Sequence, residues 1–527
     1  MSDTTEKAIA SYELRGRRRI YSDAERIDEH NIFKELSDAM ASFSKPQEEI
    51  KYLLDYEKGV QPLKREKIVR KDIDIKVSDN VANQIVEFKL GYNWGNPILF
   101  VQRGNRDLRN STNNENSEQD SAVSMLNAMN DCEYSFTKDQ ELARYVEITG
   151  IGFQMVDIKP DYDGLSAFDL ITLNPMSTFC IYRNTAKQEK LAGVTFRTLE
   201  NGTTYYTVFT PEKRFEVKNL VQIVNGERQK RWSFLQRSGE MNPLGKIPIV
   251  EFQRSPDRTG VFERQISDMD ALNIEVSDFA NSVSQTTQEV FFGVGFELAK
   301  DENGKTESPV GGQWIIAKPT PNGTPTLKAV SSTFDFEGIQ ENIVSKRNLI
   351  LQKCYVPLQS EPGGGSTGSA MSMSSGWSAA EASACREEQI LRKGKTEVAE
   401  LELIAIQKSK IPQDSPLRTL SISDIKPQFT RNKTYDLSTK VNAMVAMIKA
   451  GINGRVSMET VDLFQDVAQA WEDSKDMIEA YQKSIVEKAN GGQEEKREQS
   501  DLSDQVGNSP ILDGMTTDDS VQGGDVA

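Results

Sequence analysis

The chain has 527 residues, of which 37% are hydrophobic and 27% are charged. This length allows a large core and more than one domain, and the composition is typical of a polar globular protein. The formal net charge of −16 excludes an overall electrostatic attraction to nucleic acid. No run approaches the roughly 18 apolar residues of a membrane span, and we expect no secretory signal. We therefore expect a protein of the cytoplasm, or of a particle assembled there, without a membrane partner.

Few residues are suited to catalysis or to binding a metal or cofactor. The four cysteines are far apart and form no CxxC pair, which predicts reduced, buried thiols; they are Cys132, Cys180, Cys354 and Cys385. The single histidine, His30, lies in a charged stretch and is interpreted as a solvated helix residue, with a ligand or catalytic role as the alternative. Phosphate-loop, dinucleotide-binding, zinc-protease and nucleophile-elbow motifs are all missing. We predict no enzyme, no catalytic residue, no metal and no cofactor.

The first 29 residues are polar and carry the basic run Arg15–Arg19. We predict a solvated arm, with contact to nucleic acid or a protein partner as the alternative. A helix is predicted over Asn31–Phe43. A second helix is expected to begin near Pro46, because proline suits an early helical position, and to end at Gly59.

The chain then alternates between helices and strands up to residue 158. Asp79 is predicted to cap a helix whose apolar residues recur at helical spacing. A polar, Asn-rich loop is expected over Asn105–Asp120. The further predictions are a strand at Ile98–Val101, helices at Ser121–Asn130 and Lys138–Thr149, and a strand at Gly152–Ile158.

From Asp169 to Val250 the pattern changes to alternating β-branched and aromatic residues, with turns at Asn201-Gly202 and Asn225-Gly226. This predicts an antiparallel β-rich region.

A helix, an insertion and a returning helix follow. The predicted helix Val261–Phe292 carries one apolar stripe and a face rich in Ser, Asp, Asn and Gln, and would span about 45 Å. Gly293–Thr333 contains short strands separated by turns, and Phe336–Tyr355 is the return helix. We interpret Asp268, Asp270 and Asp278 as one solvated or interfacial face.

The stretch Pro357–Gly376 holds little that could bury apolar area, so it is either a flexible linker or a functional loop. After it we predict a long helix, a short strand, two amphipathic helices and a disordered acidic tail from Glu487. The corresponding ranges are Trp377–Gln407, Lys426–Thr430, Asp436–Lys449 and Met458–Tyr481.

Several motifs in this order resemble the portal proteins of tailed bacteriophages, in the branch typical of siphoviruses of Gram-positive hosts. The resemblance extends over about Tyr52 to Tyr481. It rests on the segments Tyr52–Leu63, Lys76–Phe100 and Gly150–Ile158, on the LNPMSTFCIY and IPIVEFQ strands, on Asp270, Asn273, Ser277, Asp278 and Asn281 at the spacing of the family's D-x-x-N-x-x-x-S-D-x-x-N helix, and on Phe429–Arg431.

The resemblance implies an α+β portal fold. Its parts would be an N-terminal arm and first helix (1–50), an α/β wing (51–260), a stem helix (261–292), a small β-containing clip (293–333), a return stem helix (334–356), a tunnel loop (357–376), a long helix with a wing strand (377–431), a helical crown (432–486) and a disordered acidic tail (487–527). The tunnel loop departs from many relatives in being rich in Gly and Ser.

The same resemblance implies a homo-oligomeric ring, of typically 12 subunits, at one vertex of the capsid in the virion. Double-stranded DNA would pass through it without sequence specificity. The implied partners are the terminase large subunit, a head-completion or adaptor protein, and the major capsid and scaffolding proteins. An acidic or neutral lining would suit this role, because a basic lining would hold the phosphates.

We expect Asp268, Glu275 and Asp278 to face the channel or a subunit interface. In the tunnel loop we expect Gly364, Ser369, Met371 and Met373 to lie close to DNA. The alternative is a non-channel structural capsid or scaffold protein that uses the helix–insertion–helix unit as an oligomerisation arm.

Overall fold

A computed structural model describes residues 14, 16–63, 73–102, 113–159, 164–224, 227–235, 239–286, 290–294, 296–298, 317–319, 326–330, 335–358, 376–431, 437–461, 470–471, 473–478 and 480. The chain divides into two compact units, Met1–Asn432 and Lys433–Ala527. Helices and strands are mixed in the first unit, which makes the chain an α+β protein, as the sequence predicted.

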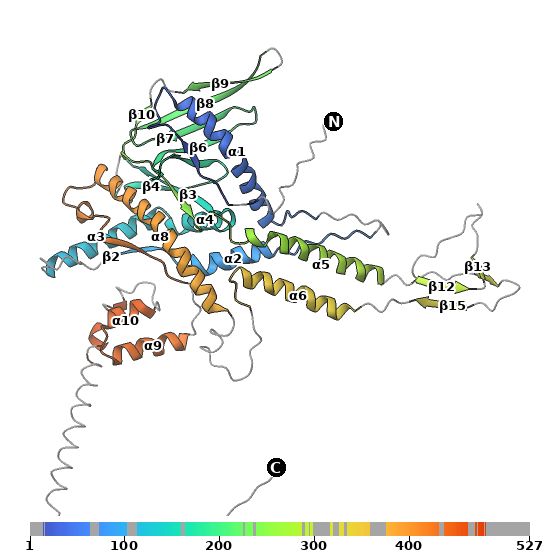
Figure 1. The fold of residues 1–527 in the computed structure, drawn as a ribbon. Coiled ribbons are helices and arrows are strands. Elements are labelled where there is room, and N and C mark those ends of the chain that lie inside the picture. The colour runs from blue at the N-terminus through green and yellow to red at the C-terminus, as the bar shows by residue number, and fades with distance from the viewer. Residues whose placement is uncertain are drawn as a thin grey trace, which may run out of the picture. The chain divides into compact units, whose positions relative to one another are not determined.

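The largest sheet of the first unit has seven strands in the order β1-β5-β6-β7-β8-β10, with β9 also paired to β8. The strands are β1 (Ile20–Ser22), β5 (Thr178–Arg183), β6 (Lys190–Thr198), β7 (Thr204–Phe209), β8 (Lys213–Val224), β9 (Glu227–Phe234) and β10 (Glu240–Met241). Only the β1–β5 pair is parallel. Helix α1 (Ile32–Glu57) packs across this sheet (Figure 1), with the ring of Phe43 4.8 Å from that of Phe179.

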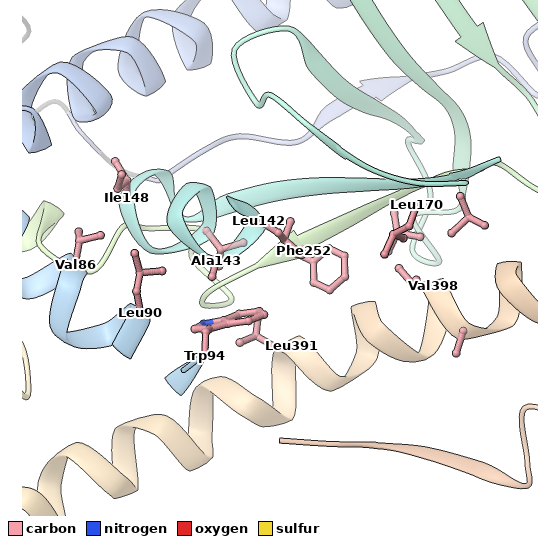
Figure 2. Close-up of a cluster of buried hydrophobic side chains, with 14 of the residues drawn as sticks. Val86, Leu90, Trp94, Leu142, Ala143, Ile148, Leu170, Phe252, Leu391 and Val398 are labelled. Carbon is pink, nitrogen blue, oxygen red and sulfur yellow. The ribbon is translucent and has the colours of Figure 1, made fainter. Parts of the chain in front are cut away.

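A second sheet of three strands, ordered β11-β3-β4, forms the centre of the larger core. Figure 2 shows side chains of α8, such as Leu391, directed toward Phe252 of β11 and Trp94 at the end of α2. The elements are α2 (Val81–Asn93), α4 (Ser135–Thr149), β3 (Ile151–Ile158), β4 (Phe168–Leu173), β11 (Ile249–Gln253) and α8 (Trp377–Lys408).

Beside this core, β2 (Leu99–Gln102) pairs with β16 (Ile425–Gln428), and α3 (Asn113–Cys132) packs near β2. A short 3-10 helix, η3 (Pro416–Thr419), precedes β16.

Two helices, α5 (Ile266–Thr286) and α6 (Phe336–Lys353), lie side by side in Figure 1. Between them in the chain are two antiparallel strand pairs. β12 (Val290–Val294) pairs with β15 (Thr326–Val330), and β13 (Phe296–Leu298) pairs with β14 (Ala317–Pro319). The helix–insertion–helix order predicted from the sequence is therefore present.

The described part of the second unit contains α9 (Leu437–Lys449) and α10 (Gly454–Val461). The predicted helix Met458–Tyr481 overlaps α10, which begins four residues earlier, at Gly454.

The N-terminal prediction was wrong in two respects. Residues 20–22 form β1 in the large sheet, so this part of the chain belongs to the fold and is not a solvated arm. Helix α1 is also continuous through Pro46, where the sequence predicted two helices. The reason is that the buried stripe of α1 continues across the proline, which is itself buried, and the burial outweighs one missing backbone hydrogen bond.

Three further boundaries differ from the prediction. The loop expected over residues 105–120 ends earlier, because α3 begins at Asn113. The cap of α2 is Asn80, whose side chain accepts from the amide of Asn83, and not Asp79. Residues 290–292, predicted as the end of the stem helix, belong to β12, where the Val-Phe-Phe run suits a strand.

The start of the stem helix also differs. Residues 263–265 form a 3-10 turn, η2 (Glu263–Gln265), and α5 begins only at Ile266. The Glu263 carboxylate accepts from the amides of Gly16 and Gly260, which holds the chain in this turn.

Candidate functional site

Helices α5 and α6 are joined along one edge by two ion pairs. The Lys353 ammonium lies 2.6 Å from the Asp268 carboxylate, and Lys346 pairs with Glu275. All four side chains are between about a third and a half exposed, so each pair contributes at most about 1 kcal/mol to stability. Their effect on surface charge is larger, because each carboxylate has a cation beside it.

The three acidic residues predicted for the stem lie on one side of α5. At 100° per residue, Asp268, Glu275 and Asp278 fall within an arc of about 80°. Asp278 is exposed, while Asp268 and Glu275 form ion pairs with lysines of α6. The structure thus brings the three onto a common face, which is partly neutralised by α6.

A second polar row on α5 is buried. Asn273, Ser277 and Asn281 are 0%, 0% and 1% exposed. Their side chains hydrogen-bond to an extended segment, residues 73–79, which lies along α5. The polar face rich in Ser, Asp, Asn and Gln that the sequence showed on this helix is therefore buried at these three residues.

The bonds repeat along this segment at every second residue. Asn281 accepts from the amide of Ile75 at 2.8 Å and donates to its carbonyl at 2.9 Å. The Ser277 hydroxyl accepts from the amide of Val77 at 3.0 Å, and its proton is shared between the carbonyls of Val77 at 3.1 Å and Asn273 at 2.7 Å. Asn273 accepts from the amide of Asp79 at 2.8 Å.

The repeat works because two spacings match. Four residues of an α-helix rise about 6 Å, and two residues of an extended strand rise about 6.6 Å. The signal was present in the sequence as Asn and Ser at intervals of four, together with the alternation of Ile73, Ile75 and Val77. The pairing itself was not visible, because the partners are about 200 residues apart.

Tyr56 of α1 adds a bond to the same side of α5. Its hydroxyl donates to Asp270 at 2.8 Å, and burial, with a smaller effect of the Asp270 charge, raises the pKa of Tyr56. Asp270 is therefore part of the internal contact of α5, so the predicted common face of Asp268, Asp270 and Asp278 is wrong for Asp270.

Arg17, in the basic run of the N-terminus, is a buried structural residue. Its guanidinium lies 3.1 Å from Glu49 of α1 and 2.6 Å from Glu263 in η2. Burial raises the pKa of Glu49, although Arg17 opposes this shift. These contacts exclude Arg17 from binding nucleic acid and fix the start of α5 to the N-terminal segment.

A second buried cluster joins helices α2, α4 and α8 to Arg254, the residue after β11. Arg254 lies 3.0 Å from Glu147 of α4 and 2.5 Å from Glu387 of α8, and Lys89 of α2 is 3.7 Å from Glu387. Burial raises the pKa of Glu147, and the neighbouring Glu387 charge adds to this effect. Because each carboxylate faces a cation inside the core, we interpret the cluster as a structural one that links these elements.

Other candidates for chemistry are few. Among the described residues, no group of three or more His, Cys, Asp and Glu side chains is placed to hold a metal ion. Cys180 and Cys354 are buried, as predicted, and burial raises their thiol pKa to about 12 and about 11. The prediction was wrong for Cys132 and Cys385, which are exposed because they lie on the outer faces of α3 and α8.

The residues that flank the predicted tunnel loop meet each other. A Cβ atom placed on Gly376 would lie 3.7 Å from the Cα of Pro357. Trp377, the first residue of α8, packs with its ring 5.5 Å from Tyr92 and 6.0 Å from Phe88. The four loop residues expected to lie near DNA fall outside the described residues; they are Gly364, Ser369, Met371 and Met373.

None of the described helices combines the length and apolar character needed to cross a bilayer. A family described as "Phage portal protein, SPP1 Gp6-like" matches residues 48–484 of the chain. A search of curated proteins found no match.

Proposed function

Because the chain belongs to the phage portal protein family, we propose that it forms a ring whose axial channel passes double-stranded DNA into and out of the capsid. Membership of this family of non-enzymatic phage components already gives the general role of a capsid protein that connects head and tail and serves DNA packaging. The proposal adds the channel, its lining and the partners. A ring of typically 12 subunits remains the expected size.

One observation carries the channel proposal: the helix pair offers no unpaired cation. Helix α5 contains no Lys or Arg. The three basic residues of α6 are all engaged within the chain, Lys346 with Glu275, Lys353 with Asp268, and Arg347 with Asp79 at 3.3 Å. A surface without free cations gives DNA phosphates nothing to displace their counterions, so duplex DNA can slide along it.

We assign the channel surface to the face of α5 and α6 that carries Asp268, Glu275 and Asp278. On it the first two acids are neutralised by lysines, and Asp278 supplies negative charge. The tunnel loop, 357–376, is proposed to enter the same channel, with Gly364, Ser369, Met371 and Met373 near DNA. The contact between the residues that flank the loop supports a closed loop rather than an extended linker.

The strand pairs between α5 and α6 are proposed to form the clip, at which the terminase large subunit docks during packaging. A head-completion or adaptor protein would bind there afterwards. ATP hydrolysis would belong to the terminase. The major capsid and scaffolding proteins are the proposed neighbours of the wing.

The test adds free cations to the proposed channel face. Asp278→Lys combined with Ala271→Lys places two lysines, in excess of the carboxylates there, on the exposed side of α5. We expect purified rings of this variant to retain linear duplex DNA at low salt and to release it as salt rises. Capsids assembled with the variant should package less DNA. The matched control is Glu200→Lys with Asn201→Lys, on an exposed hairpin of the wing.

Equal DNA retention by the channel variant, the control and the unmodified chain would contradict the assignment of this face. The alternative function, a structural capsid or scaffold protein without a channel, predicts that outcome.

A further inference from the structure

The extended segment 73–79 has a second edge, whose peptide groups are free of hydrogen bonds within the described part of the chain. In an extended chain the peptide groups of alternate residues point to opposite sides. The groups of Ile75, Val77 and Asp79 point to α5. Those of Asp74, Lys76 and Ser78 make no hydrogen bond with any other residue that the structure describes, and all three residues are exposed.

An edge of this kind is a template for pairing with another chain. Lys76 is the only Lys or Arg between residues 73 and 80; it lies 3.6 Å from the Asp74 carboxylate and stays about half exposed, so it can also meet a second carboxylate. A matching partner would therefore offer hydrogen-bonding groups at a repeat of about 6 Å together with a carboxylate.

Helix α6 carries such a set on a side turned away from α5. Glu341, Ser345, Asn348 and Gln352 are spaced by four, three and four residues, and fall within an arc of about 60°. Glu341, Ser345 and Gln352 are exposed and Asn348 is partly exposed. No hydrogen bond or ion pair joins these four side chains to the rest of the described chain.

This stripe repeats the chemistry that α5 already uses on the inner edge of the segment. The α5 residues that bond to the segment are Asn273, Ser277 and Asn281, which are one serine and two carboxamides. The α6 stripe also has one serine and two carboxamides, with Glu341 in addition. The inner edge of the segment thus shows, within one chain, how the outer edge can be bound.

We propose that the α6 stripe of one copy binds the open edge of segment 73–79 in the next copy. The order segment, α5, α6 would then repeat from copy to copy, with Lys76 facing Glu341 or Glu337. Because the two surfaces are different patches of the same chain, the contact is head-to-tail, and head-to-tail contacts form a ring when the rotation between copies closes. This inference rests on the proposed ring and names the residues that hold it together.

The first test is cross-linking between copies. Cys132 and Cys385 are replaced by Ser, and Lys76→Cys is combined with Ser345→Cys. Under mild oxidation we expect disulfide-linked multimers in steps of one subunit, up to the full ring. The control pair, Lys76→Cys with Glu200→Cys, should remain monomeric on denaturing gels.

The second test uses two prolines one residue apart. Lys76→Pro removes an outward N–H, so ring assembly should weaken roughly two- to tenfold per contact while the melting temperature of the unassembled chain stays unchanged. Ile75→Pro removes the N–H bound by Asn281, so it should lower the melting temperature instead.

Rings visible by electron microscopy that give no Lys76–Ser345 cross-link would overturn this inference and leave the proposed function standing. Equal effects of Lys76→Pro and Ile75→Pro on ring assembly would also overturn this inference without contradicting the proposed function. Absence of rings in the unmodified chain would contradict the proposed function itself.

Discussion

Glu402 shows how a single buried side chain can make this protein sensitive to pH. It lies on α8, fully enclosed, and accepts one hydrogen bond from the Asn130 amide at 3.2 Å. Its other oxygen has no hydrogen-bond partner among the described residues. Burial raises the pKa of Glu402 from 4.5 to about 7, because the charged carboxylate has little to replace its hydration.

We predict that the unfolding free energy falls as pH rises from about 4.5 to about 7. In this window the folded chain keeps a proton on Glu402 that the unfolded chain has released, so raising the pH favours unfolding. The shift corresponds to about 3 kcal/mol, with no contribution to the slope below pH 4.5 or above pH 7. Chemical denaturation at a series of pH values measures it.

Glu402→Gln keeps the shape and the acceptor for Asn130 and cannot ionise. This variant should lose the part of the slope that Glu402 contributes and be more stable than the unmodified chain at pH 8. Glu200→Gln, on an exposed hairpin, should keep the slope. An unchanged slope in the Glu402 variant would show that another group is responsible.

At the scale of elements, the contact between α5 and segment 73–79 depends on side-chain amides bonding to backbone. Asn281→Ala removes two bonds to Ile75, and we expect a loss of about 1–3 kcal/mol in the unfolding free energy. Hydrogen exchange at the Ile75 and Val77 amides should accelerate. Ser267→Ala, on the exposed side of the same helix, should change stability by less than about 0.5 kcal/mol.

If exchange at Ile75 and Val77 stays slow in Asn281→Ala, the segment is held by its apolar side chains and the proposed role of the polar row fails.

Most helices and strands could be predicted, because their apolar periodicity is local. The predicted Trp377–Gln407 helix is α8, and the predicted strand Gly152–Ile158 is β3 with one residue added. Errors occurred where distant partners decide the outcome. The residues next to Arg17 in the sequence predict a solvated charge. Arg17 is buried because it pairs with Glu49 and Glu263, which are distant in the sequence.

For the candidate site too, local features were predictable and contacts with distant residues were not. Asp268, Glu275 and Asp278 were expected to face a channel or a subunit interface, and in the structure they share one side of α5. The pairing of Asp268 and Glu275 with lysines of α6 could not be predicted from the sequence, because it depends on how the two helices pack. Whether this face lines a channel stays a prediction, as does the position of the tunnel-loop residues.

At the scale of the whole molecule, the order of elements carried the resemblance, and the family match over residues 48–484 confirms the portal family. No single motif could do so, since the chain has no catalytic or cofactor signature. A single chain cannot contain the proposed channel, because such a channel would form only between copies.

Electron cryo-microscopy of the purified full-length protein tests the central claim most directly. We predict closed rings, of about 12 subunits, with a continuous axial hole wide enough for duplex DNA and with the α5–α6 face that carries Asp278 turned toward that hole. Monomers, open chains or closed rings without a through-hole would contradict the account.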